Sequence, residues 1–182
     1  MDTMAKTVSV ARHGEHAFSK PSCQEIRLLA GRGIEGDAHC GETVKHRSRV
    51  AIDPNQPNLR QVHLIAEELF GELAQKGFWV RPGDLGENIT TQGIDLLSLP
   101  VATRLRIGPQ AILELTGLRN PCKQIDSFQS GLMQAVLGRD ETGAITLRAG
   151  VMAIVISGGT VRAGDEIQIE LPPAPHQKLM RV

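Results

Sequence analysis

Residues 103–116 read TRLRIGPQAILELT, and this stretch decides the fold class. Polar and apolar side chains alternate in Thr103–Ile107 and again in Ala111–Thr116. A period of two residues is typical of a half-buried β-strand. Gly108-Pro109 interrupts the alternation and favours a turn. The stretch therefore predicts two strands joined by a short turn.

The same reasoning, extended along the chain, predicts a mainly β protein. Seven further segments are expected to be strands: Thr7–Ala11, Glu25–Leu29, Arg60–Ile65, Asn88–Thr91, Ile145–Arg148, Val151–Ile156 and Glu166–Leu171. Apolar side chains at helical spacing predict helices at Glu67–Lys76, ended by Gly77, and at Gln124–Leu137, interrupted by Gly131. Many short strands with few helices predict a closed or half-closed β-barrel with helices packed outside.

The length of the chain predicts one domain. Its 182 residues fall within the usual range of roughly 100–200 for a single domain, and no linker divides them. We expect one domain over residues 1–182, with a core at about 8–170. Prolines at the start of residues 172–182 predict a loosely held tail.

The charge balance and the low aromatic content argue against some classes of binding partner. The 20 Lys and Arg residues balance the 20 Asp and Glu residues, so no electrostatic footprint for nucleic acid or an anionic membrane is present. Four Phe and one Trp offer few platforms for stacking bases. We expect a small-molecule cofactor or substrate as the partner, with no nucleic acid and no membrane.

The cysteines indicate a reducing compartment. Cys23, Cys40 and Cys122 are odd in number and form no CxxC pair, which argues against a disulfide framework. Residues 1–11 contain no apolar run long enough for a signal peptide, and Val151–Ile156 is far shorter than the ~20 residues of a membrane helix. The sequence predicts a cytoplasmic protein.

Cys122 is the strongest candidate for chemistry. It follows a predicted strand in TGLRNPCKQ (116–124), near the expected start of a helix, where backbone N–H groups and the flanking Arg119 and Lys123 favour a thiolate. We therefore expect a lowered pKa. A thiolate can attack sulfur, carry a persulfide or ligate a soft metal. The alternative is that Cys122 is a small apolar core residue.

Three other features have plainer alternatives. His39, Cys40 and His46 suggest zinc, but their spacing fits no usual zinc site, and a surface loop held by Asp37 is favoured. His63 alternates with apolar neighbours and is expected on the outer face of its strand. The loop GDLGEN (83–88) offers Glu87 and Asn88 as hydrogen-bonding groups, or is an ordinary turn.

Several motifs in order resemble the MOSC family, named after the C-terminal domain of molybdenum cofactor sulfurases. The motifs are GDAH (36–39), RQV (60–62), GDLGENIT (83–90), LRNPC (118–122), and the closing stretches GVM (150–152) and GDEI (164–167). The resemblance covers about residues 8–170. It implies a β-barrel and a role with the molybdenum cofactor or its sulfur.

The resemblance also implies roles for particular residues. Cys122 would ligate molybdenum, and the molybdopterin cofactor would lie around it. Family enzymes of this kind reduce N-hydroxylated compounds, and stand-alone members have been proposed as sulfur carriers, here with a persulfide on Cys122. Arg119 and Lys123 would meet the phosphate or dithiolene charge, Glu87, Asn88 and Thr116 would contact the pterin, and His39 would cap the cleft or supply a proton. The family is also associated with pyridoxal phosphate.

The sequence departs from the larger family members in several ways. We find no aminotransferase-like domain, no additional N-terminal barrel, and no His-Gly-Gly pattern in residues 40–58. These departures weigh against a reductase more than against binding of cofactor or sulfur. Three hypotheses remain open: a molybdenum-dependent reductase, a sulfur-delivery module served by a cysteine desulfurase or a reductase partner, and a non-catalytic ligand-binding β-barrel in which Cys122 is only structural.

Overall fold

The computed structural model describes residues 4–182, so the first three residues of the predicted domain lie outside the described part. The strands are β1 (Lys6–Ala11), β2 (Ser22–Cys23), β3 (Glu25–Leu29), β4 (Gly33–Ile34), β5 (Val62–Ala66), β6 (Ile89–Gln92), β7 (Arg104–Ile107), β8 (Ala111–Leu118), β9 (Leu137–Arg139), β10 (Ile145–Leu147), β11 (Val151–Ser157), β12 (Gly159–Arg162) and β13 (Ile167–Glu170). The helices are α1 (Arg47–Val50), α2 (Glu68–Gln75), the 3-10 helix η1 (Leu96–Ser98), α3 (Gln124–Phe128) and α4 (Leu132–Ala135).

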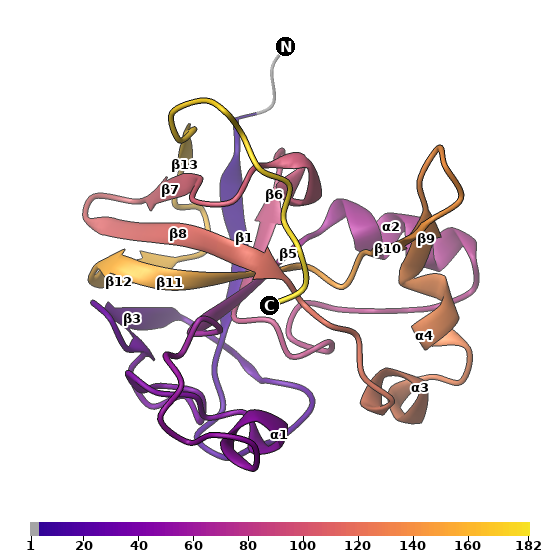
Figure 1. Cartoon of the computed structure of the whole chain (residues 1–182), viewed down its shortest axis with the longest axis horizontal. Helices are drawn as coiled ribbons and strands as arrows, with labels where there is room; N and C mark the ends of the chain where they lie inside the picture. Colours follow the sequence, from indigo (N-terminus) through magenta and orange to yellow (C-terminus); the bar gives the residue numbers. More distant parts are fainter. Residues whose placement is uncertain (1–3) are drawn as a thin grey trace.

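Most strands belong to one large sheet. Its order is β13-β7-β8-β11-β5-β6-β1-β2, with β5 and β6 parallel and the other neighbours antiparallel. A smaller sheet has the order β12-β3-β4, and β9 pairs with β10. In Figure 1 the eight-stranded and three-stranded sheets occupy the left and centre, whereas α2, α3 and α4 gather with β9 and β10 on the right.

The mainly β class is confirmed, but the expected closure into a barrel is not. Hydrogen bonds near an isolated bridge between Lys6 and Glu166 link β1 to the start of β13, and no continuous ladder follows. The other edge strand, β2, has only two residues, so it cannot offer β13 a full edge for pairing. Strand alternation predicts which face is buried; it does not predict whether two sheet edges meet.

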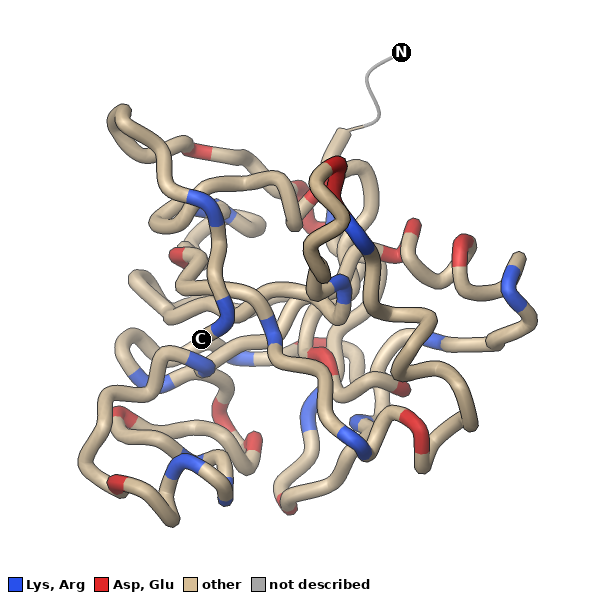
Figure 2. The backbone as a smooth tube through the Cα atoms, turned by 45° about the vertical axis from the view of Figure 1, so that its right-hand side comes forward, with Lys and Arg blue, Asp and Glu red and all other residues tan. Residues whose placement is uncertain are grey.

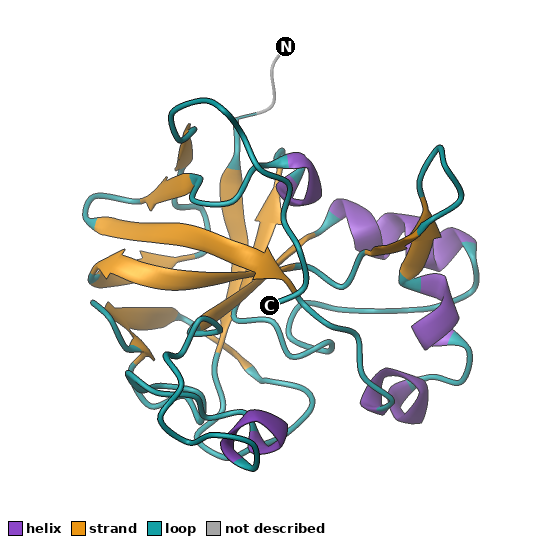
Figure 3. Cartoon of the chain, in the orientation of Figure 1, coloured by secondary structure: helices purple, strands orange, loops and turns teal. Residues whose placement is uncertain are grey.

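The alternation that defines the predicted strands also builds the core. In β8 every second residue is buried, including Leu113 and Leu115, and β7 follows the same pattern. These side chains join the larger of two apolar clusters, which fills the space between the sheets. A second cluster lies among α2, α3 and α4, which Figure 3 shows in purple on the right, and includes Leu69, Leu73 and Ile125.

The two predicted helices have different outcomes. α2 lies within the predicted Glu67–Lys76, and Gly77 ends it in a left-handed conformation (φ +86°). The predicted Gln124–Leu137 helix is instead split into α3 and α4. Gly131, which precedes α4, also has a left-handed conformation (φ +87°), and this breaks the helical path.

The last six residues pack against the body of the protein, in contrast to the loose tail expected from residue 172. We call residues 177–182 the strap. The amide of Val101 donates to the carbonyl of Gln177, and that of Leu118 donates to Met180. Leu179 is only 6% exposed and belongs to the main apolar cluster.

Within residues 4–182, none of the helices combines the length and the apolar character needed to cross a membrane. Basic and acidic residues are interspersed along the backbone (Figure 2), in keeping with the balanced composition.

Candidate functional site

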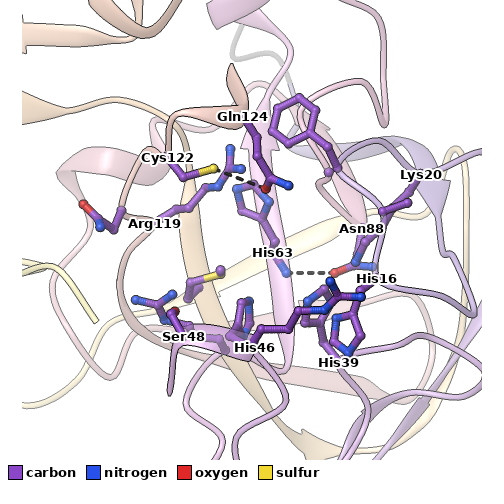
Figure 4. Close-up of a pocket in the computed structure, with 17 residues that line it drawn as sticks. His16, Lys20, His39, His46, Ser48, His63, Asn88, Arg119, Cys122 and Gln124 are labelled. Carbon is purple, nitrogen blue, oxygen red and sulfur yellow. Dashed lines mark hydrogen bonds between the residues drawn. The ribbon is translucent and has the colours of Figure 1, made fainter. Parts of the chain in front are cut away.

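A pocket of about 360 Å³ opens beside the end of β8. Figure 4 shows its side chains. They come from the β1–β2 connection, the loop around α1, β5, the loop before β6, β11 and the segment that follows β8. The lining residues are His16, Ala17, Phe18, Lys20, His39, His46, Arg47, Ser48, Arg60, His63, Gly86, Asn88, Arg119, Asn120, Cys122, Gln124 and Met152.

Cys122 lies in the turn between β8 and α3. Its carbonyl accepts a hydrogen bond from the amide of Ile125 at 3.0 Å, so the turn is held by the first residues of the helix. The thiol is half-buried and lies 3.6 Å from Oε1 of Gln124 (Figure 4). α3 begins at Gln124, two residues after Cys122, at the start predicted from the sequence.

Arg119 brings a positive charge on a half-buried side chain to the same wall. Its Nη1 atom is buried and has no hydrogen-bond partner among the described residues. Its guanidinium lies 5.8 Å from the ring centroid of Phe18. Burial lowers the pKa of Arg119, and the negative charges of Cys122 and Glu87 act in the opposite direction. A buried cation without a counterion is costly, so this wall favours an anion.

A network around Asp37 builds the opposite wall. Lys20 Nζ lies 2.9 Å from Asp37 Oδ2, and Asn88 Nδ2 donates to the same oxygen at 3.1 Å. The amide and Nδ1 of His39 lie 2.9 and 3.2 Å from Oδ1. Burial alone would raise the pKa of Asp37, but the hydrogen bond from His39 and the charge of Lys20 hold it well below its usual range. Asp37 is therefore ionised, and it neutralises Lys20.

The glycines of the GDLGEN loop (83–88) fix the position of this wall. A Cβ at Gly83 would lie 2.1 Å from the carbonyl oxygen of Lys20, and one at Gly86 would lie 2.4 Å from that of Phe18. Both glycines also have left-handed φ values, +87° and +85°. They let the loop pack directly on residues 18–20, which carries Phe18 and Lys20 into the pocket.

Three imidazoles line the floor of the pocket. The rings of His39 and His46 are stacked with centroids 4.2 Å apart, and His16 meets His39 edge-on at 5.1 Å. Burial, with repulsion from His39, lowers the pKa of His46 to about 3, and its buried Nδ1 has no partner among the described residues. Burial lowers the pKa of His16 too.

His63 is buried, contrary to the expectation that it lies on the outer face of its strand. Its Nε2 lies 2.8 Å from the carbonyl oxygen of Ala149, and its amide donates to Asn88 Oδ1 at 3.1 Å. Burial, with a contribution from Arg119, lowers its pKa well below the usual value. Four successive residues of β5, from Val62 to Ile65, are buried, so both of its faces are covered and alternation cannot identify an outer one.

The lining of the pocket has a one-sided charge. It includes Lys20, Arg47, Arg60 and Arg119, and none of its residues is an Asp or a Glu. Lys20 pairs with Asp37, whereas no ion pair to a carboxylate is found within residues 4–182 for Arg47, Arg60 or Arg119. The guanidinium groups of Arg47 and Arg119 therefore remain to meet an anionic ligand, and that of Arg60 already contacts the Val182 oxygen.

The described residues contain no group of three or more His, Cys, Asp or Glu side chains that could hold a metal ion. The zinc alternative at His39, Cys40 and His46 therefore gains no support. The positively charged lining fits an anionic ligand better than a bare metal ion.

Comparisons with known proteins agree with this fold. The family model of the MOSC domain matches residues 38–168, well over half of the chain. The chain belongs to the MOSC family. The family is associated with binding of the molybdenum cofactor. No curated protein matches the sequence.

Solved structures share the MOSC fold seen here. The YuaD protein from Bacillus subtilis is 27% identical, with a TM-score of 0.76, and the match covers 94% of this chain and 98% of that chain. YiiM from Geobacillus stearothermophilus is 14% identical, with a TM-score of 0.68 and coverage of 96% and 79%. YiiM from Escherichia coli is 19% identical, with a TM-score of 0.62 and coverage of 94% and 73%.

The structure brings four of the predicted MOSC site residues together in the pocket: Cys122, Arg119, Asn88 and His39. The other three lie outside its lining. Oε1 of Glu87 accepts hydrogen bonds from the amide of Gly83 and the hydroxyl of Thr90, and burial raises the pKa of Glu87. The hydroxyl of Thr116 donates to the carbonyl of Leu59 at 2.6 Å, and Lys123 is exposed.

Sequence reasoning did not assign six titratable lining residues to the site: His16, Lys20, His46, Arg47, Arg60 and His63. Arg60 belongs to the MOSC motif RQV (60–62), and this motif is the only feature of the sequence that could have assigned Arg60 to the site. The others reach the pocket through strand pairing and loop packing that no local pattern specifies.

Proposed function

We propose that this MOSC domain binds the molybdenum cofactor in the pocket, with the Cys122 thiolate as its protein ligand to molybdenum. The observation that carries the proposal is the unbalanced positive charge around Arg119. The cofactor has a phosphate and a dithiolene, so it is an anion with several charges. Arg47, Arg60 and Arg119 offer it guanidinium groups that no carboxylate of the lining competes for.

The unpartnered atoms of the pocket support the fit. The buried Nη1 of Arg119 and the buried Nδ1 of His46 lack partners within the described chain, and a bound ligand would supply them. The pocket volume of about 360 Å³ lies within the range of roughly 300–1,000 Å³ seen for small-molecule sites.

Each residue has a role that follows from its surroundings. The Cys122 thiolate is a soft ligand that suits molybdenum. Arg119 balances the negative charge beside it, because it is buried and otherwise unpaired. Nδ1 of His39 donates to Asp37, which orients the ring and leaves Nε2 free to accept a proton and pass it to a substrate. When bound, the cofactor supplies two-electron redox chemistry, and reduction of the N–O bond of an N-hydroxylated compound is the reaction we propose, with electrons from a partner reductase.

The test of cofactor binding is loading in a host that makes the cofactor. We expect stoichiometric molybdenum and pterin in the purified wild type, measured by elemental analysis and by fluorescence of the oxidised pterin. Cys122→Ser should lose most of the molybdenum. Cys23→Ser is the matched control, because the Cys23 thiol lies outside the pocket, 3.6 Å from the carbonyl oxygen of Val10. Metal-free wild type from such a host would remove the proposal.

Sulfur delivery is a second candidate, favoured by the same neighbours of Cys122. A persulfide on this half-buried thiol would be anionic, and the unpaired guanidinium of Arg119 would stabilise it. The protein would be incubated with a cysteine desulfurase and cysteine, and its intact mass measured. One added sulfur on the wild type and on Cys23→Ser, but none on Cys122→Ser, is the expected result. No added sulfur on the wild type would eliminate this candidate.

A further inference from the structure

The strap (residues 177–182) lies beside the pocket, at the end of β8. The amide of Leu118 donates to the Met180 carbonyl at 2.8 Å, and the amide of Val182 donates back to Leu118 at 3.2 Å. In Figure 1 the end of the strap, marked C, lies next to the arrowhead of β8. Leu179 anchors the strap in the main apolar cluster. The strap therefore continues the pairing of β8 just before the chain turns toward Cys122.

Gly117 provides the space that the strap occupies. A Cβ at this position would lie 2.4 Å from the carbonyl oxygen of Met180, 2.7 Å from Cβ of Val182 and 2.9 Å from its Cγ1. All three atoms belong to the strap. Gly117 lies inside β8, where the backbone is extended and accepts an alanine. Position 117 therefore requires glycine because the strap packs against it, and not because of its backbone conformation.

Arg60 connects the strap to the pocket. It lines the pocket, and its Nη2 donates a hydrogen bond to the carbonyl of Val182. Burial lowers the pKa of Arg60 to about 10, and repulsion from Arg49, Arg119 and Arg181 adds to this. Its guanidinium thus lies near three other positive charges, which would drive a flexible side chain out toward solvent.

We propose that the strap is a positioning element: the Val182 carbonyl holds Arg60 in the wall of the pocket, and Gly117 is the residue that allows the strap to lie there. The contact with the Val182 oxygen fixes the direction of the guanidinium, so Arg60 faces the pocket and does not swing out to solvent. The consequence for ligand affinity rests on the anion-binding function proposed above, whereas the position of Arg60 does not.

The first test reads the position of Arg60 directly. In Gly117→Ala the new methyl group displaces the strap. The reaction of Arg60 with phenylglyoxal, followed by peptide mass mapping, should then be several-fold faster than in the wild type. Gly71→Ala is the matched control, because no atom lies within 4 Å of its added Cβ in α2, and its rate should equal that of the wild type. Equal rates in Gly117→Ala and wild type would overturn the proposal.

A second variant covers the case in which Gly117→Ala does not fold. Leu179→Ala weakens the anchor of the strap without changing β8 or the lining of the pocket. It should also speed the reaction of Arg60. An unchanged rate in this variant would contradict the proposal equally.

The second test measures the consequence with inorganic pyrophosphate as the probe. By titration calorimetry, Gly117→Ala should bind pyrophosphate about ten- to a hundredfold more weakly than the wild type, the range expected when one hydrogen bond to a charged group is lost. In an Arg60→Met background the same substitution should cause no further loss, because the strap acts through Arg60. An equal loss in both backgrounds would overturn a role through Arg60. If the wild type bound no pyrophosphate, the anion-binding function would fail, and the phenylglyoxal rates would still decide the role of the strap.

Discussion

Arg119 and His46 each bury a polar atom that no described residue satisfies. A buried polar group without a partner costs about 1–3 kcal/mol, and a charged one costs more. Both residues line the same pocket, so the cost is concentrated at a site where a ligand could relieve it. This pattern is typical of a binding site that was selected for function at the expense of stability.

The buried imidazole of His46 should make the stability depend on pH. Its pKa is lowered to about 3 in the folded protein, from a usual value of 6.5. Between these values the unfolded chain binds a proton that the folded protein does not, so the free energy of unfolding falls as pH drops below about 6.5. One such group contributes at most about 1.4 kcal/mol per pH unit.

His46→Gln should therefore flatten the slope of unfolding free energy against pH between pH 4 and 6, measured by urea unfolding. The variant should parallel the wild type between pH 7.5 and 9, where an imidazole is neutral in both states. Identical slopes below pH 6 would show that His46 is protonated in the folded protein.

The candidate site was predicted best where its residues are neighbours in sequence. Cys122 and Arg119 lie three positions apart on one turn, so local reasoning found both. Adjacent residues of an extended chain point to opposite sides, and of Glu87 and Asn88 only Asn88 reaches the pocket. Lys20 and Arg60 come from distant segments, and their arrival depends on loop packing that the sequence does not reveal locally.

At the level of elements, the strand predictions held wherever the alternation was long. β7 and β8 alternate over their whole lengths, and both were predicted. β12 was missed because Gly158 and Gly159 suggested only a turn; its four residues pair with β3. Gly131 marked the place where the predicted helix divides into α3 and α4. The sequence alone does not show whether a glycine continues a helix or ends it, because that depends on its φ angle.

Substitution by alanine should change the free energy of unfolding in opposite directions at two glycines, Gly71 and Gly150. Gly71 lies inside α2 with no atom within 4 Å of an added Cβ, so Gly71→Ala should stabilise the protein by about 0.5–1 kcal/mol. An added Cβ at Gly150 would lie 2.3 Å from the Leu64 carbonyl oxygen, and its φ is +96°, so Gly150→Ala should destabilise by more than about 2 kcal/mol.

Urea unfolding of the two variants beside the wild type gives both values. Each variant adds the same methyl group, so the comparison isolates the surroundings of the glycine. A similar change in both variants would mean that α2 or the connection before β11 differs from the described structure.

At the scale of the whole molecule, strand order is what the sequence could not provide. The predicted strands can be ordered in many ways, and the observed order places β5 between β6, the next strand along the chain, and β11, which comes much later, whereas β4 belongs to the smaller sheet. This order brings the 60–63 segment beside the 149–152 segment and the end of β8, which is where the pocket forms. The position of the site is therefore a property of the topology.

The charge of the pocket couples ligand binding to the stability of the whole domain. Pyrophosphate at about 100 times its Kd should raise the unfolding free energy of the wild type by about 2.7 kcal/mol, or the Tm by about 5–10 °C for a chain of this length. Arg119→Met removes a buried cation and places an apolar side chain over Phe18. Without pyrophosphate, its Tm should be higher than that of the wild type, by the equivalent of about 1 kcal/mol.

With pyrophosphate, Arg119→Met should show little further rise in Tm, whereas Arg139→Met, a change of the same kind on β9 outside the pocket, should keep the full response. Differential scanning fluorimetry at fixed ionic strength separates specific binding from screening, because screening affects both variants alike. A lower Tm for Arg119→Met without the anion would mean that its guanidinium has a partner in the folded protein. The unpaired charge, and with it the reason for an anionic ligand, would then be lost.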